Sequence, residues 1–80
     1  MIRGNIKKGD LMVTKQDVWG RQTFNFNHQV NYMIKEGTCI IATSDEEYYD
    51  AIGVSEVSCL IDSGVVILTI TTGDELRVVN

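Results

Sequence analysis

Few residues of this 80-residue chain could do acid–base or nucleophilic chemistry, and they are scattered. His28 is the only histidine, and the two cysteines, Cys39 and Cys59, lie in separate apolar runs. A catalytic thiol needs a histidine beside it and an acid that orients the histidine, and no spacing here indicates such a group. The sequence also lacks a glycine-rich phosphate loop and a paired-carboxylate motif. We therefore expect no enzyme, and we interpret His28 as a structural residue.

The cysteines do not indicate a metal site either. A zinc site needs cysteines paired at short spacing with further Cys or His ligands, and Cys39 and Cys59 stand alone. We interpret them as two reduced, buried thiols of a cytosolic protein, with a disulfide between neighbouring strands as the alternative. No cofactor and no metal are expected.

Four carboxylates gather between residues 45 and 50, beside two tyrosines. Such a cluster could coordinate a divalent cation, but it lacks the spacing and the glycine of a calcium loop. The other interpretations are a solvated loop and an acidic patch that docks on a basic partner, with the tyrosines as interface anchors. The candidate partner-binding residues here are Asp45, Glu46, Glu47, Tyr48, Tyr49 and Asp50.

A long segment from Gln16 to Glu36 holds the second candidate partner surface. Its Trp19-Gly20 pair is typical of a turn with an anchoring aromatic residue. Residues 24–34 alternate in polarity, which predicts a half-buried strand or hairpin with an amide-rich outer face. An edge strand of this kind is a candidate for pairing with another chain, whereas the alternative is a long loop folded back on its own barrel. The candidate residues are Trp19, Phe24, Asn27, Asn31 and Tyr32.

The basic residues suggest a different partner, a single-stranded nucleic acid. Residues 1–40 carry six basic and three acidic side chains, and residues 41–80 carry one and eight. The six cations, together with Trp19, Phe24 and Phe26, could form a basic surface with stacking aromatics. The net charge of −4 and the alternation that turns both phenylalanines inward argue against it. The six cations are Arg3, Lys7, Lys8, Lys15, Arg21 and Lys35.

The elements that position these residues are expected to be β-strands, because apolar residues alternate with period two and rarely recur at helical spacing. Two strands around the turn Asp62-Ser63-Gly64 form the clearest hairpin. The apolar run in 38–43 predicts a strand covered on both faces, and 72–76 reads as a turn or a single turn of 3₁₀ helix. The five predicted strands cover 10–15, 38–43, 54–61, 65–71 and 77–79, and the count rises to six or seven if residues 24–34 contribute. Several short strands with turn signals indicate a small barrel or a sandwich.

The order of these elements resembles an SH3-like barrel, and its spacing is similar to that of small barrels encoded by tailed bacteriophages. The resemblance implies an all-β, five-stranded SH3-like barrel with a long first loop or an extra hairpin at residues 16–36, in a single domain spanning 1–80. The motif Tyr48-Tyr49-Asp50-Ala51 resembles the aromatic-acidic motif of peptide-binding SH3 domains, but it follows the second strand rather than the first. The resemblance is carried by Lys8-Gly9-Asp10-Leu11, Glu36-Gly37-Thr38-Cys39-Ile40-Ile41, Val57-Ser58-Cys59-Leu60-Ile61-Asp62-Ser63-Gly64 and Glu75-Leu76-Arg77-Val78-Val79.

Together these features favour a non-enzymatic protein–protein interaction module. The phage resemblance implies a virion or assembly component, or a small factor that binds a host protein. The expected partner is a protein, either a second copy or a host protein, and the alternative is a nucleic-acid-binding barrel. Because no targeting signal or membrane span is recognisable, we expect a cytoplasmic location, which the phage resemblance would make the cytoplasm of the host cell or the virion.

Overall fold

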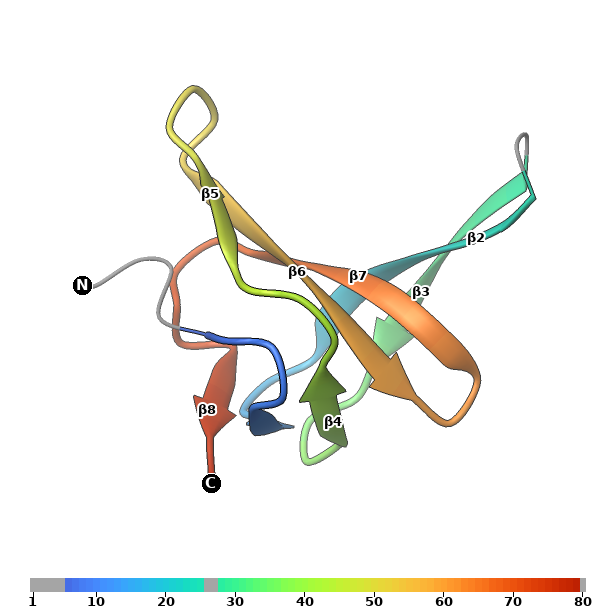
Figure 1. Ribbon diagram of the computed structural model, residues 1–80, viewed down its shortest axis with the longest axis horizontal. Helices are drawn as coiled ribbons and strands as arrows, with labels where there is room; N and C mark the ends of the chain where they lie inside the picture. The colour runs from blue at the N-terminus through green and yellow to red at the C-terminus, as the bar shows by residue number, and fades with distance from the viewer. Residues whose placement is uncertain (1–5, 26–27, 80) are drawn as a thin grey trace.

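A computed structural model describes residues 6–25 and 28–79 of the chain (Figure 1). This part of the chain is all-β and contains no helix, so no helix is long and apolar enough to cross a membrane. The strands are β1 (Leu11–Thr14), β2 (Val18–Asn25), β3 (His28–Ile34), β4 (Cys39–Ala42), β5 (Glu47–Tyr49), β6 (Val54–Ile61), β7 (Gly64–Ile70) and β8 (Leu76–Val78).

The eight strands form a single antiparallel sheet. Seven of them follow the order β3-β2-β7-β6-β4-β1-β8, and the eighth, β5, pairs with β6 outside this order. The end strands β3 and β8 do not pair with each other, so the sheet is not closed. The expected all-β fold is confirmed, but the sheet is open rather than a five-stranded barrel, and the β2–β3 hairpin and β5 are added to the five expected strands. The physical reason is that β2 pairs with β7 through Gly20 and Arg21, which occupies the edge that β7 would need for closure.

The segment 16–36 forms a long β-hairpin rather than a loop. Strands β2 and β3 pair from Val18↔Ile34 outward to Asn25↔His28, with a register shift between Thr23 and Asn25. The expected turn at Trp19-Gly20 is wrong, because both residues lie inside β2. Gly20 faces the core, where a Cβ would lie 3.2 Å from Ile34 Cδ1. The close approach of the two strands thus explains the glycine.

The core lies between the inward faces of the strands, and alternate residues supply it. The hairpin predicted at 54–61 and 65–71 is confirmed as β6 and β7, joined at Gly64 with a φ of 123°. Gly64 takes the left-handed conformation that a side chain would strain. The largest side chains that are fully buried are Met12, Ile40, Leu68, Val57 and Val66, with Cys59 beside them.

Strand β4 departs from its prediction, since only one of its faces is covered. Ile40 and Ala42 are buried, whereas Cys39 and Ile41 are exposed. The expectation of two buried cysteines is therefore wrong for Cys39 and confirmed for Cys59, and both thiols are free. A continuous apolar run indicates that both faces of a strand are apolar, but it does not say that a second layer is present.

Two connections also differ from expectation. The polar loop predicted before Gly53 contains the short strand β5, which pairs Tyr49 with Val54 of β6. The segment 72–76 is a series of bends without a 3₁₀ turn. It is held instead by the Glu75 carboxylate, which accepts hydrogen bonds from the backbone N–H groups of Thr71 (2.8 Å) and Gly73 (2.9 Å).

Candidate functional site

The two candidate partner surfaces lie on either side of the outer face of β7. Figure 1 shows the β5–β6 hairpin and the β2–β3 hairpin diverging from β7 as two arms. The arms are tied at their base by Arg21 of β2 and Glu56 of β6, whose Nη2 and Oε2 atoms lie 3.3 Å apart. Arg21 is paired with Ile67 of β7, and Glu56 with Thr69. The ion pair therefore crosses β7 diagonally.

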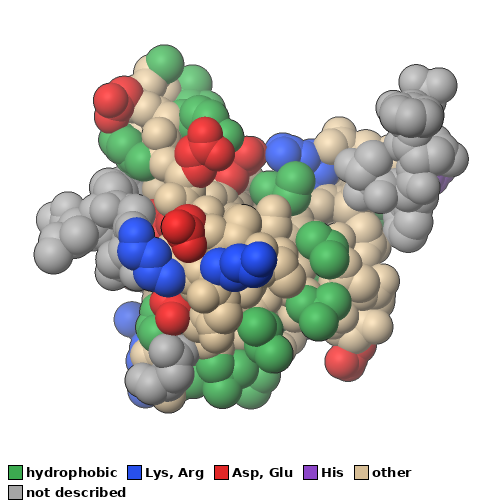
Figure 2. All heavy atoms as spheres, viewed as in Figure 1, with side chains coloured by type: hydrophobic (Ala, Val, Ile, Leu, Met, Phe, Trp, Pro, Cys, Tyr) green, Lys and Arg blue, Asp and Glu red, His purple; other side chains and the backbone are tan. Residues whose placement is uncertain are grey.

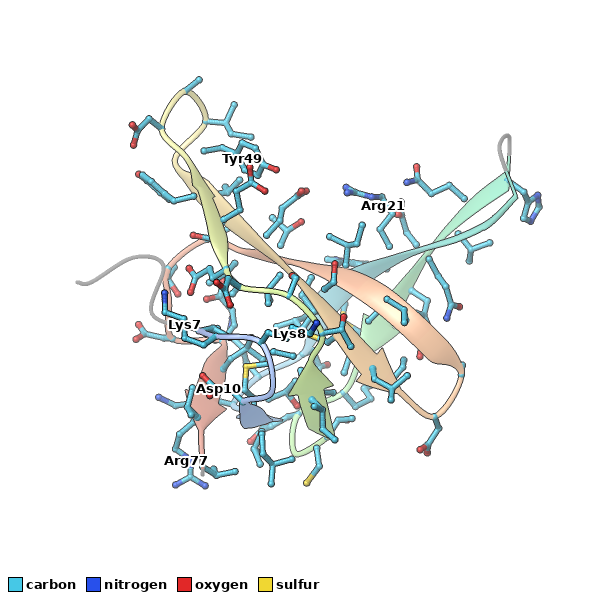
Figure 3. The ribbon with its side chains drawn as sticks, in the orientation of Figure 1. Lys7, Lys8, Asp10, Arg21, Tyr49 and Arg77 are labelled. Atoms are coloured by element: carbon cyan, nitrogen blue, oxygen red, sulfur yellow. The ribbon has the colours of Figure 1, made fainter. Side chains whose placement is uncertain are left out.

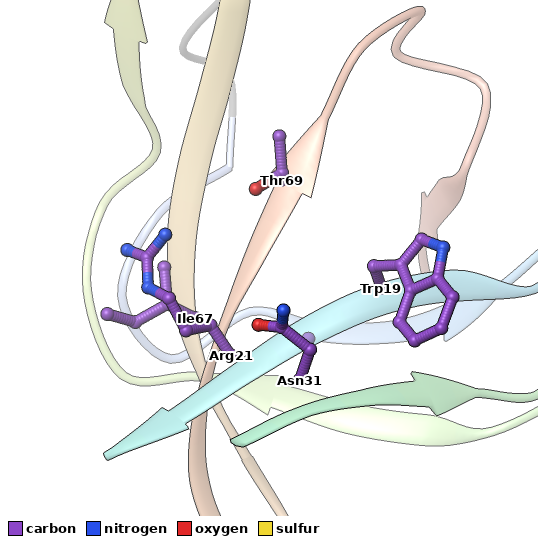
Figure 4. A pocket seen from close by; sticks show the side chains of 6 residues that line it. Trp19, Arg21, Asn31, Ile67 and Thr69 are labelled. Atoms are coloured by element: carbon purple, nitrogen blue, oxygen red, sulfur yellow. The ribbon is translucent and has the colours of Figure 1, made fainter. Parts of the chain in front are cut away.

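Trp19 dominates the β2–β3 side of this face. Its side chain is 60% exposed and borders a hollow of about 500 Å³ that is also lined by Gly20, Arg21, Asn31, Ile67 and Thr69 (Figure 4). A second hollow of about 390 Å³ continues past Trp19 toward the end of β7. The two hollows share Trp19 and Thr69, and we call them together the Trp19 groove. Lining residues of the second hollow are Gln16, Asp17, Val18, Trp19, Thr69, Thr71 and Glu75.

The β5–β6 arm encloses a third hollow of about 210 Å³ on the other side of Ile67. Ile67 lines this hollow as well as the larger hollow beside Trp19, so it forms a shared floor. Figure 3 shows Tyr49 and Arg21 on the two arms, facing the space between them. A ligand lying along β7 could therefore contact both arms. Lining residues of the third hollow are Ser44, Asp45, Glu47, Tyr49, Glu56, Val57, Ser58 and Ile67.

Carboxylates outnumber cations around these hollows. Among the described lining residues of all three, Arg21 is the only lysine or arginine, and it is engaged by Glu56. Burial raises the pKa of the Tyr49 hydroxyl, the carboxylates of Glu47 and Glu56 raise it further, and Arg21 opposes them. Tyr49 thus stays a neutral hydrogen-bonding group at physiological pH. Of the carboxylates that line the third hollow, Glu56 is paired with Arg21, whereas Asp45 and Glu47 make no ion pair with another described residue.

Two acidic residues at the far end of the groove are already engaged within the fold. The backbone N–H of Glu36, 2.9 Å from Asp17 Oδ1, lowers the pKa of Asp17, and Lys35 Nζ at 3.5 Å acts in the same direction. Burial by itself would raise the pKa of Glu75, but hydrogen bonds from Thr71 and its neighbours lower it to about 2. Glu75 therefore holds the β7–β8 connection and is not available to a ligand.

The structure separates the residues of the predicted acidic cluster. Asp45 Oδ1 accepts a hydrogen bond from Lys8 N at 2.8 Å, and Glu46 Oε1 accepts one from Ile6 N at 3.4 Å. These two residues fasten the segment before β1, while Asp50 is exposed in the β5–β6 turn. No group of three or more His, Cys, Asp or Glu residues that could hold a metal occurs within residues 6–25 and 28–79.

The remaining candidate partner residues are divided between the two faces. Asn31 joins Trp19 in the groove, and Tyr32 packs against the core while its hydroxyl shares a hydrogen bond of 3.0 Å with Ser63. Tyr48 stands opposite the buried Ser55, on the other face of β5 from Tyr49. Asn27 and the Phe24 side chain lie outside the described residues, as does Phe26.

The basic residues do not assemble into one surface. Lys7 and Lys8 precede β1, whereas Lys15 follows it, and Lys35 is paired with Asp17. Figure 3 shows Arg21 at the β2–β3 arm, apart from Lys7 and Lys8. Arg3 lies outside the described residues.

Sequence reasoning missed the residues that complete the groove. Ile67 and Thr69 were recognisable as one face of β7, but nothing in the sequence shows that β2 pairs with that strand. Glu56 alternates with buried residues of β6 and so could be placed on an outer face, but not beside Arg21. Comparison of the chain with protein-family models, with curated proteins and with solved structures found no match.

Proposed function

We propose that the chain is a non-enzymatic binding module that holds an extended segment of a partner protein in the Trp19 groove. The observation that carries this proposal is the position of Trp19, a 60% exposed indole standing between two hollows on the outer face of β7. Exposed tryptophans beside hollows are typical anchors of protein interfaces. An extended segment can lie along a strand face and place alternate side chains in successive hollows.

The charges of the groove indicate what this segment carries. Glu47 and Glu56 line the third hollow, beside the Trp19 groove, and Glu56 is paired with Arg21, the one lysine or arginine among the described lining residues. We expect an apolar or aromatic side chain against Trp19 and a lysine or arginine toward the two carboxylates. The scattered lysines give less support to a nucleic acid, which needs neutralising contacts along its backbone.

An SH3-like ancestry is part of the same proposal. Strands β1, β4, β6, β7 and β8 follow the order of the barrel that the sequence resembles, with the β2–β3 hairpin in place of the long first loop. The arm carrying β5 occupies the second loop. If the chain shares the role of the phage-encoded barrels that it resembles, the bound segment belongs to a virion protein or to a host protein.

Selection from a random dodecapeptide library on the immobilised protein tests this function. Enriched peptides are expected to combine a basic residue with an aromatic or apolar one, and Trp19→Ala should weaken their binding about tenfold or more. Ile52→Ala is the matched control, because Ile52 is 70% exposed in the β5–β6 turn and lines none of the hollows described.

Two results would overturn the proposal. One is a library without enrichment, and the other is an affinity that Trp19→Ala leaves unchanged. A labelled single-stranded oligonucleotide is measured in parallel at low salt. Tight binding that falls steeply with added salt would favour the nucleic-acid alternative instead.

A further inference from the structure

A row of exposed aliphatic side chains crosses four neighbouring strands on the outer face of the sheet, β7, β6, β4 and β1, and ends at Val79, the residue after β8. Its members are in direct register: Leu11 with Ile41, Ile41 with Leu60, and Leu60 with Val65. Val79 extends the row past β1, since its N–H donates to the carbonyl of Leu11 at 2.8 Å. We call these five residues the apolar row; their exposed fractions are 39% for Val79 and for Leu11, 45% for Ile41, 46% for Leu60 and 52% for Val65.

The apolar row differs from the usual scatter of exposed apolar residues, because its members are contiguous. Figure 2 shows hydrophobic side chains gathered over β4, β6 and β7 on this face. Contiguous exposed apolar patches mark interaction surfaces more often than isolated residues do. Strand β4, moreover, has the continuous apolar sequence of a strand covered on both faces, although only Ile40 and Ala42 are buried. The outer face is therefore suited to a second layer.

The row beside it supplies a charge pattern. Val13 is in register with Arg77 of β8 on one side and with Cys39 of β4 on the other. Asp62 follows β6 and lines a hollow together with Cys39, so it continues this row at the opposite end from Arg77. Neither Arg77 nor Asp62 makes an ion pair within the part of the chain that the structure describes. A cation and an anion thus stand at the two ends of an otherwise uncharged row.

We propose that the apolar row is the contact surface of a homodimer in which two sheets pack face to face. The two-fold axis lies in the interface, runs parallel to the strands and passes between β1 and β4. Each row then packs against the same row of the second copy, with the order of the strands reversed. Leu11 then faces Ile41 of the second copy, and Arg77 faces Asp62 of the second copy. This self-complementarity in shape and charge selects a second copy of the chain as the occupant.

The size of the surface indicates a weak dimer. With the axis between β1 and β4, two rows overlap across four positions about 4.8 Å apart and leave Val65 at the margin; they cover roughly 250 Å², below the roughly 800 Å² per partner of a standard interface. We expect a dissociation constant in the micromolar range and a monomer–dimer equilibrium that concentration shifts. The Trp19 groove lies along the other half of β7, so this inference does not depend on the proposed function.

Sedimentation velocity from about 10 µM to 1 mM tests the dimer. Ile41→Asp should abolish association, whereas Ile52→Asp, in the β5–β6 turn and outside the apolar row, should not. Arg77→Glu and Asp62→Lys should each weaken the dimer, and the double variant Arg77→Glu/Asp62→Lys should restore it, because each ion pair re-forms with reversed charges. Thermal denaturation of every variant shows whether the fold is retained.

Cys39 provides a measurement that needs no substitution in the apolar row. In the proposed packing the two copies of Cys39 lie about 11 Å apart between Cα atoms, given sheets about 10 Å apart and an offset of one strand. A short bis-maleimide should therefore cross-link the wild-type protein into a covalent dimer, and Cys39→Ser should abolish the product. A monomer at 1 mM, a dimer that Ile41→Asp leaves intact, or failure of the charge-reversed pair to restore association would overturn the proposal.

Discussion

The Arg21 guanidinium and the Glu56 carboxylate lie 3.3 Å apart although 35 residues separate them in the chain. The two side chains are 34% and 26% exposed, so solvent screens their attraction only in part. They join the two arms above the floor formed by Ile67. Their pairing explains how segments that are distant in sequence come together on one face of β7.

A double-mutant cycle on this pair should give a coupling free energy of about 0.2–1 kcal/mol, the range of partly exposed ion pairs. Arg21→Ala and Glu56→Ala are compared with the double variant by urea denaturation at low and at high salt. The coupling should shrink with added salt, because the charges are partly solvated. Additive single effects at low salt would show that the pair does not hold the arms together.

Glu75 should make the protein sensitive to acid. Its folded pKa of about 2 lies below the ordinary value of 4.5, so its ionised form stabilises the fold above about pH 4.5. That contribution is lost as the pH falls from 4.5 toward 2. Glu75→Gln should cost about 1–3 kcal/mol at neutral pH, because an amide group cannot satisfy the donors of Thr71, Thr72 and Gly73 together.

The pH dependence separates Glu75 from a general effect of carboxylates. Urea denaturation between pH 2 and 7 should show a smaller loss of stability on acidification for Glu75→Gln than for the wild type. Asp50→Asn is the control, because Asp50 is exposed in the β5–β6 turn. Parallel pH profiles for Glu75→Gln and the wild type would contradict the role assigned to Glu75.

The two thiols should differ strongly in reactivity. Cys59 is fully buried, and burial raises its pKa to about 12, so its thiolate is scarce and shielded from reagents. Cys39 is exposed. Iodoacetamide at pH 8 should add one group rapidly and a second only on unfolding, as mass spectrometry can show. The folded Cys39→Ser variant should take up no iodoacetamide. Two rapid additions to the wild-type protein would contradict the prediction, because they would mean that the core opens and exposes Cys59.

These residues also show what the sequence could predict. Alternation is a local property, and together with the turn residues it correctly predicted the β6–β7 hairpin, where turn and strands are adjacent in the chain. It also showed that Ile40 and Ile41 lie on opposite faces of β4. It could not say which face is covered, because that depends on whether another layer packs there, and so Cys39 was wrongly placed inside.

The candidate site was predictable in its parts but not in its assembly. Trp19 and the tyrosines were recognised from residue type and neighbourhood. The pairing of Arg21 with Ile67 connects positions far apart in the chain, and no local pattern encodes it. Gly20 was mistaken for a turn glycine, because close strand packing and a turn both favour glycine, and only the tertiary structure tells them apart.

Two buried hydroxyl groups should respond in opposite ways to removal. The Ser55 side chain is fully buried, and its Oγ has no hydrogen-bond partner among the described residues. Thr14 is 1% exposed, and its Oγ1 donates to the carbonyl of Lys35 at 2.8 Å and accepts from Thr38 N at 2.9 Å. Burying a hydroxyl without a partner costs free energy, whereas removing one that satisfies two backbone groups leaves both unpaired.

Ser55→Ala should therefore leave the free energy of unfolding unchanged or raise it by up to about 1 kcal/mol. Thr14→Val keeps the shape of the side chain and should lower that free energy by about 1–3 kcal/mol. Urea denaturation of the two variants beside the wild type measures both effects. A loss of stability in Ser55→Ala as large as that in Thr14→Val would mean that the Ser55 hydroxyl is hydrogen-bonded in solution.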